Sequence, residues 1–134
     1  MEFLSPYKSS ILILGVIGFL SLVQLLIADL YALKIKHTPG YPIKPDHNNF
    51  IFRAARAHSN TNESIAIFVI FLLFGMFSTA SPQWLYYFSL AYLVGRILHM
   101  ILYYMNMQLA RSASFLLILV GLFGMFAVGI DAYF

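Results

Sequence analysis

The chain has 134 residues, of which 61% are hydrophobic and only 10% are charged, and its formal net charge is +3. This composition, with a mean hydropathy of +0.83, excludes a soluble globular domain and is typical of a membrane protein. The absence of cysteine excludes disulfide bonds and a cysteine nucleophile. No basic cluster is interleaved with aromatic residues, so we expect no nucleic acid partner.

The first predicted element is an apolar segment over residues 11–33, interrupted by only three polar side chains. It is longer than the apolar region of a signal peptide, and no small-x-small cleavage site follows it. We therefore interpret it as a retained transmembrane helix. The loop that follows, residues 34–49, contains three prolines and a glycine, which prevent a regular helix there.

Three further apolar segments follow, and together with the first they predict a single all-α domain over residues 1–134, a bundle of four transmembrane helices. Asn48 or Asn49 is the expected N-cap of the second helix, and Ser81 with Pro82 is expected to begin the third. We expect short turns at 78–81 and 108–111. The second, third and fourth spans are predicted at 49–77, 83–107 and 112–133.

Basic residues gather at one end of this bundle, in or beside the first and third loops, whereas the second loop carries no charge. The positive-inside rule places loops 1 and 3 in the cytoplasm and both termini on the opposite side of the membrane. The basic residues concerned are Lys34, Lys36, Lys44, Arg53 and Arg111.

Two polar stripes interrupt the apolar helices. The spacing +3, +4, +3 places the first on one helix face, and the spacing +3, +4 does the same for the second. An ionisable side chain inside a membrane is costly, so each stripe is a candidate functional site. The first stripe is Arg53, Arg56, Asn60 and Glu63; the second is Arg96, His99 and Tyr103.

Depth along the helices relates the two stripes. At about 1.5 Å per residue, counted from Phe77 and Trp84, Glu63, Arg96 and His99 lie roughly 18–22 Å into their spans. A buried Glu63–Arg96 ion pair is therefore expected. Such a pair could serve only to hold helices together, but the excess of cations over carboxylates favours a site for an anionic ligand.

Histidine and glutamate also raise the question of a metal. His58 lies off the first stripe, and the chain has neither cysteine ligands nor an H-x-x-x-H spacing. We therefore expect no metal site at His58, His99 and Glu63.

The stripes also resemble a known family. The segment Arg53-Ala-Ala-Arg56-Ala-His58-Ser-Asn60-Thr-Asn-Glu63 resembles the pattern R-x-x-R-A-H-x-N-x-x-E of the membrane-associated proteins in eicosanoid and glutathione metabolism. Gly95-Arg96-Ile-Leu-His99, followed by Tyr103, is similar to the third-helix pattern of that family. Arg111-Ser112 is similar to the turn before its fourth helix. Microsomal glutathione transferases and prostaglandin E synthase are among its members.

The resemblance implies a homotrimer that binds glutathione in a cytoplasm-facing cleft between subunits. Arg111 would hold the glutathione thiolate with Ser112 close by, although Ser112 could instead be only the N-cap of the last span. Lys34 stands where relatives often place an arginine from the adjacent subunit. Tyr104 competes with Tyr103 for one position in the site. The other implied ligands of glutathione are Arg53, Arg56, Asn60, Glu63, Arg96, His99 and Tyr103.

The function expected from these features is that of a glutathione transferase or peroxidase acting on lipophilic electrophiles or lipid hydroperoxides that arrive from the bilayer. A single arginine close to the thiol, in a low-dielectric site, would provide enough stabilisation for the thiolate. The alternative is a non-enzymatic small membrane transport or scaffolding protein with a buried Arg–Glu–His cluster. The sequence leaves both possibilities open.

Overall fold

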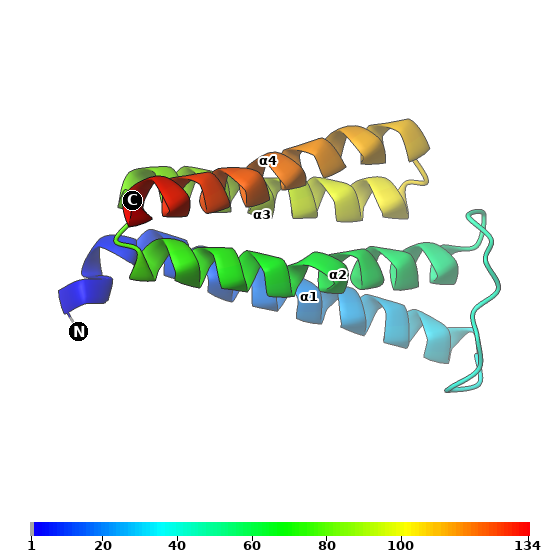
Figure 1. The fold of residues 1–134 in the computed structure, drawn as a ribbon. Helices are drawn as coiled ribbons and strands as arrows, with labels where there is room; N and C mark the ends of the chain where they lie inside the picture. Colours follow the sequence, from blue (N-terminus) through cyan, green and yellow to red (C-terminus); the bar gives the residue numbers. More distant parts are fainter. Residues whose placement is uncertain (1) are drawn as a thin grey trace.

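Four long helices run up and down the bundle in a computed structural model that describes residues 2–134 (Figure 1). Each of the four is long and apolar enough to cross a membrane, which confirms the predicted all-α membrane fold. The short 3-10 helix η1 precedes the first of them. The elements are η1 (Glu2–Tyr7), α1 (Lys8–Lys34), α2 (Phe50–Phe77), α3 (Pro82–Tyr104) and α4 (Gln108–Tyr133).

The helices are arranged as two antiparallel pairs, α1 with α2 and α3 with α4 (Figure 1). The α1–α2 loop and the α3–α4 turn lie at the same end of the bundle, and both termini lie at the other end. This arrangement gathers the basic residues in or beside the α1–α2 loop and the α3–α4 turn at one end, as the charge distribution predicts.

The first three helices end in the same way. Lys36, Thr79 and Asn106 adopt positive φ angles of 56–59° two residues after their helices end. At the third of these ends, Asn106 N–H donates to the Tyr103 carbonyl and Met107 N–H donates to the Leu102 carbonyl. This is the Schellman arrangement, which satisfies the last carbonyl groups of a helix.

That third helix end corrects the predicted boundaries. The turn expected at 108–111 lies instead at 105–107, so α3 ends earlier and α4 begins earlier than predicted. Asn106 is the residue responsible, because asparagine tolerates the left-handed conformation that stops α3. Arg111 therefore lies in the first turns of a helix and not in a loop.

The predicted helix starts are confirmed more closely. Asn49 is the N-cap of α2, and its side-chain oxygen accepts from the Ile51 N–H at 3.2 Å. Ser81 occupies the N-cap position of α3 with Pro82 next to it, but the Ser81 side chain makes no capping hydrogen bond. The interpretation of Ser112 as the N-cap of the last span is wrong, because α4 begins at Gln108 with Met107 in the N-cap position.

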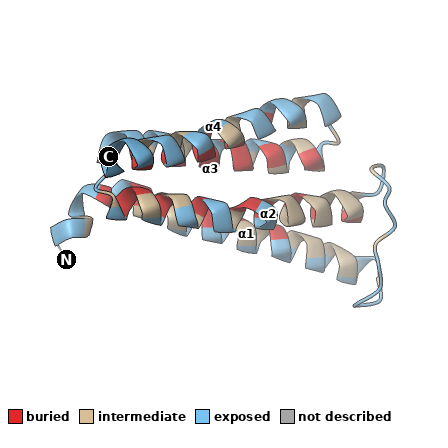
Figure 2. Cartoon of the chain, in the orientation of Figure 1, coloured by how far each residue is buried: buried red, intermediate tan, exposed pale blue. Residues whose placement is uncertain are grey.

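Close contact between α3 and α4 depends on glycine. A Cβ atom built at Gly121 would lie 2.7 Å from the backbone nitrogen of Tyr92, and one at Gly95 would lie 2.7 Å from the Ile118 side chain. The buried residues shown in red in Figure 2 follow the inward faces of the helices. These two glycines therefore determine the separation of the helices that carry half of the predicted site residues.

Candidate functional site

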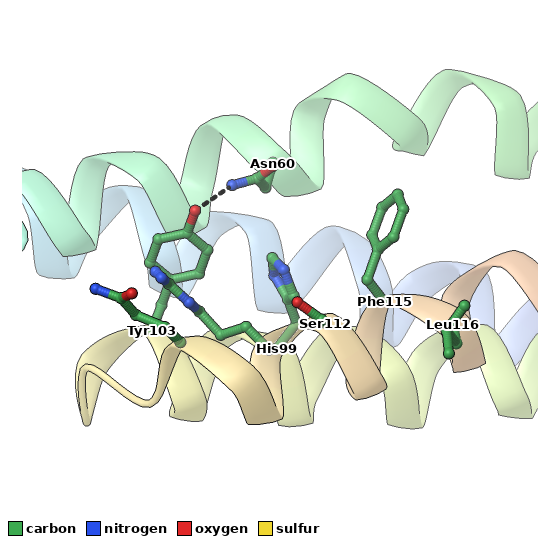
Figure 3. A pocket seen from close by; sticks show the side chains of 8 residues that line it. Asn60, His99, Tyr103, Ser112, Phe115 and Leu116 are labelled. Carbon is green, nitrogen blue, oxygen red and sulfur yellow. Dashed lines mark hydrogen bonds between the residues drawn. The ribbon is translucent and has the colours of Figure 1, made fainter.

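A pocket of about 500 Å³ opens between α2, α3 and α4, close to the α3–α4 turn (Figure 3). Five of the predicted site residues line it, contributed by three different helices. The remaining lining residues were not predicted from the sequence. The residues that line the pocket are Asn60, His99, Tyr103, Gln108, Arg111, Ser112, Phe115 and Leu116.

Asn60 and Tyr103 connect α2 and α3 across this pocket. The Asn60 amide donates to the Arg56 carbonyl at 2.8 Å and to the Tyr103 hydroxyl at 3.1 Å (Figure 3). Because the Tyr103 oxygen accepts this bond, its own O–H remains able to donate to a ligand. The His99 ring lies edge-on to the Tyr103 ring, with the ring centres 5.1 Å apart.

The choice between the two neighbouring tyrosines is settled by the helix geometry. Tyr103 lines the pocket, whereas the Tyr104 ring packs beside Phe50 with the ring centres 5.4 Å apart. Consecutive residues on a helix point about 100° apart, so only one of the two can face the pocket. Tyr103 is that residue.

Arg111 brings a positive charge to the pocket from α4. Its guanidinium carbon lies 4.1 Å from the centre of the Tyr103 ring, within the range of a cation–π interaction. Its Nη1 is buried and has no hydrogen-bond partner among residues 2–134. Ser112, next in the chain, also lines the pocket.

Arg96 lies in a different environment from the one predicted. Its residue surface is only 1% exposed, and it does not line the pocket. Its Nε donates to the Tyr92 hydroxyl at 3.3 Å and its Nη2 donates to the Ser64 hydroxyl. The two hydroxyl groups are themselves hydrogen-bonded at 2.6 Å. Arg96, Ser64 and Tyr92 thus form a buried network between α2 and α3.

The predicted Glu63–Arg96 ion pair is wrong. The Glu63 side chain is 60% exposed and lies 3.6 Å from Arg56 of its own helix. The depth estimate gave the height of Glu63 along the helix axis but not its direction around that axis. Ser64, one residue further along, is the side chain that points toward Arg96.

Removing the Tyr92 hydroxyl from the buried network should lower the free energy of unfolding measurably. Tyr92→Phe would delete the partner of both Ser64 and Arg96 while the ring stays in place. We expect a loss of about 1 kcal/mol, the usual size for such a bond within a membrane. Thermal unfolding in detergent measures it. Tyr133→Phe, at an exposed position, is the matched control, and equal melting temperatures for the two variants would contradict the network's contribution.

Several predicted site residues lie outside the pocket. Arg53 donates to the His47 carbonyl at 2.6 Å and so holds the α1–α2 loop. Arg56 and Glu63 form their ion pair on the exposed side of α2. Lys34 is exposed at the end of α1. The described chain therefore brings together Asn60 with His99, Tyr103, Arg111 and Ser112, but not these four.

Three lining residues were missed by the sequence analysis. Gln108 was assigned to a turn, and Phe115 and Leu116 were counted only as part of an apolar span. Spacing would have identified the last two, because Phe115 lies four positions after Arg111 and Leu116 lies four positions after Ser112, and residues four apart share a helix face. Phe115 and Leu116 are exposed, and they give the pocket an apolar side.

The charges of the pocket indicate the ligand it can bind. Its lining includes an arginine and no aspartate or glutamate. A buried guanidinium N–H without a partner is costly, and a negatively charged group would satisfy it. The polar groups of Asn60, Tyr103 and Ser112 add hydrogen-bonding positions. The arrangement is suited to an anion that also presents an apolar or reactive part toward α4.

Comparison with known proteins agrees with the sequence motifs. A family model described as the MAPEG family matches residues 5–130, nearly the whole chain. This match confirms the resemblance to the membrane-associated proteins in eicosanoid and glutathione metabolism. Neither a search of curated proteins nor a search of solved structures gave a match.

Proposed function

Because this chain belongs to the MAPEG family, we propose that it is a membrane enzyme that binds glutathione and uses its thiolate against lipophilic electrophiles or lipid hydroperoxides. Family membership supports a general role in glutathione or eicosanoid metabolism at a membrane. The transferase or peroxidase activity is the finer proposal, and it rests on the pocket between α2, α3 and α4.

The observation that carries this proposal is the buried, unpartnered Nη1 of Arg111 in a pocket whose lining includes no carboxylate. Glutathione carries two carboxylates and a thiol, so it can supply the missing negative charge. A free thiol titrates near 8.5, and half ionisation at pH 7 requires about 1.5 pKa units, or roughly 2 kcal/mol. One arginine within about 4 Å of the sulfur can provide that stabilisation.

The other polar residues of the pocket have distinct roles in this proposal. The Tyr103 O–H, held in place by the Asn60 amide, can donate to the sulfur and stabilise the thiolate further. His99 can accept the thiol proton, since a neutral imidazole always has one unprotonated nitrogen. Ser112 can donate a further hydrogen bond from the first turns of α4.

The second substrate would meet the thiolate from the apolar side of the pocket. Phe115 and Leu116 line that side and are exposed on α4. In a membrane, an exposed apolar helix face contacts lipid. A lipophilic electrophile could therefore approach along α4 without leaving the bilayer, while glutathione approaches from the end that carries the basic loops. We assign that end to the cytoplasm on the distribution of lysine and arginine.

We also propose that the functional assembly is a homotrimer. Lys34 and Glu63 are exposed in one chain and the Arg56 side chain is partly exposed, although all three match family positions implied in glutathione binding. A neighbouring subunit would bring its own Lys34 toward the pocket and cover these charges. Native mass spectrometry in detergent tests the assembly, and a monomer that binds glutathione with full affinity would contradict it.

Thiolate formation is the direct test of the function. Glutathione added to the purified chain at pH 7 should produce an ultraviolet difference spectrum with thiolate absorbance, and S-methyl glutathione should not. A chain that gives no thiolate signal, yet is folded and assembled, would favour the alternative of a transport or scaffolding protein. The buried Arg96 network would then be its main polar feature.

A further inference from the structure

A second pocket, of about 620 Å³, lies on the α1 side of α2, away from the candidate glutathione site. Its walls are α1, the loop between α1 and α2, and the first turns of α2. This volume is in the range of sites for small amphiphilic molecules. Most of the lining is apolar, and the polar side chains among it are Asp29, His37, Tyr41, His58 and Ser59.

Asp29 is an uncompensated charge in this pocket. It lies in the candidate membrane span of α1, five residues before the end of the helix at Lys34, or about 7 Å along the axis. Among residues 2–134 the only ion pair joins Arg56 and Glu63, so Asp29 has no basic partner there. Asp29 is exposed on α1. An ionisable side chain in a membrane span normally has a partner, and a cationic ligand in this pocket would provide one.

His58 contributes a hydrogen-bond donor to the same pocket as Asp29. The Asn62 side-chain amide nitrogen lies 2.9 Å from His58 Nε2, and the Ser21 hydroxyl donates to the Asn62 side-chain oxygen at 3.2 Å. Since the amide nitrogen can only donate, His58 Nε2 accepts, and the proton of the neutral ring is on Nδ1. Nδ1 is buried and has no hydrogen-bond partner among residues 2–134. The ring therefore holds a free donor.

We propose that this pocket binds an amphiphilic amino alcohol. The ammonium group pairs with the Asp29 carboxylate, and the neighbouring hydroxyl oxygen accepts the hydrogen bond from His58 Nδ1. The aliphatic chain lies along Leu25, Ala28 and Ile51, which line the same pocket. A fatty acid is excluded by repulsion from Asp29, and an amine without an oxygen leaves His58 unsatisfied.

This site requires neither glutathione nor the pocket around Arg111, so its test is independent of the test of the proposed function. The full-length chain in detergent is titrated with sphinganine, a long-chain amino alcohol, and adducts are measured by native mass spectrometry. Asp29→Asn should weaken sphinganine binding about tenfold. Asp131→Asn, which removes a carboxylate from the last turns of α4 at the opposite end of the bundle, should leave it unchanged.

A second variant tests the role of the hydroxyl. His58→Gln keeps a group that can bond Asn62 but removes the Nδ1 donor, so it should weaken sphinganine binding about fivefold. It should not affect the alkylamine of the same chain length, which has no oxygen to accept the bond. The difference between the two ligands separates a specific contact from general damage to the pocket.

Three results would overturn the proposal. Sphinganine could bind Asp29→Asn as tightly as the unmodified chain. The fatty acid of the same chain length could bind as well as sphinganine. Asp29→Asn could change the mass of the assembly without changing sphinganine binding, which would assign the pocket to contact with a second copy of the chain.

Discussion

Arg111→Ala is expected to remove most of the glutathione thiolate while glutathione itself remains bound. The Arg111 guanidinium is the cation that lines the pocket, and it lies 4.1 Å above the Tyr103 ring. Without it the thiol pKa should return toward 8.5, so that only a few per cent of the thiol is ionised at pH 7. Turnover of a standard electrophile should fall roughly tenfold or more.

The dependence of activity on pH distinguishes stabilisation of the thiolate by Arg111 from a purely structural role. The variant's thiol would ionise as the pH rises through about 8.5, so its activity should recover toward alkaline pH. Arg111→Lys should retain part of the activity, because a point charge replaces part of the guanidinium's effect. Binding should weaken only modestly, since Asn60 and Tyr103 still provide hydrogen bonds.

A charge-matched control tests whether Arg111 acts only as a basic anchor at the membrane surface. Lys44→Ala removes one positive charge from the exposed α1–α2 loop at the same end of the bundle. It should leave the thiolate spectrum and the pH profile unchanged. If Arg111→Ala behaved like Lys44→Ala in both measurements, the anchor interpretation would replace the catalytic one.

Gly121→Ala is expected to destabilise the bundle strongly, although it adds only one methyl group. The added Cβ would lie 2.7 Å from the Tyr92 backbone nitrogen and 2.8 Å from the Phe88 carbonyl oxygen. Neither atom can move without separating α3 from α4. Overpacking of this kind costs about 1–3 kcal/mol, and rigid backbone neighbours favour the upper end of that range.

The same separation should disturb the pocket. α3 carries His99 and Tyr103 and α4 carries Arg111, so an increase in the distance between the helices would weaken the Arg111–Tyr103 contact. The melting temperature in detergent should fall by about 5 °C or more, and thiolate formation should fall with it. Both measurements can be made on one preparation.

Gly18→Ala is the matched control for this substitution. It adds the same methyl group within α1, where no atom lies within 4 Å of the built Cβ. Alanine is the better helix former by about 1 kcal/mol, so Gly18→Ala should be neutral or stabilising. Equal losses from the two substitutions would show that close α3–α4 packing at Gly121 is not what limits stability.

Much of the fold followed from local features of the chain. Long apolar segments require helices in a membrane, because every backbone polar group must be satisfied within the segment. Proline and asparagine gave the starts of α2 and α3, at Asn49 and Pro82. The end of α3 was predicted less well, since the left-handed conformation of Asn106 competes with continued apolar periodicity beyond it.

The composition of the candidate site was partly readable from residue spacing and from the family motifs. Asn60, His99 and Tyr103 were named from their spacing, Arg111 and Ser112 were named from the family resemblance, and all five line one pocket. Spacing along a helix reports which residues share a face, and these residues do so within α3 and within α4. The spacing did not decide which members of a stripe face the pocket, because Arg56, Glu63 and Arg96 belong to the same stripes and do not line it.

Contacts between helices could not be obtained in this way. Counting residues gave Glu63 and Arg96 the same depth, yet Glu63 is exposed beside Arg56, and Arg96 is buried against Ser64 and Tyr92. Depth depends only on the rise per residue, whereas direction depends on how each helix is rotated about its axis. That rotation is set by the packing of whole faces, such as the close approach of α3 and α4 at Gly121, and so the partner of a buried charge emerges only when the helices are assembled.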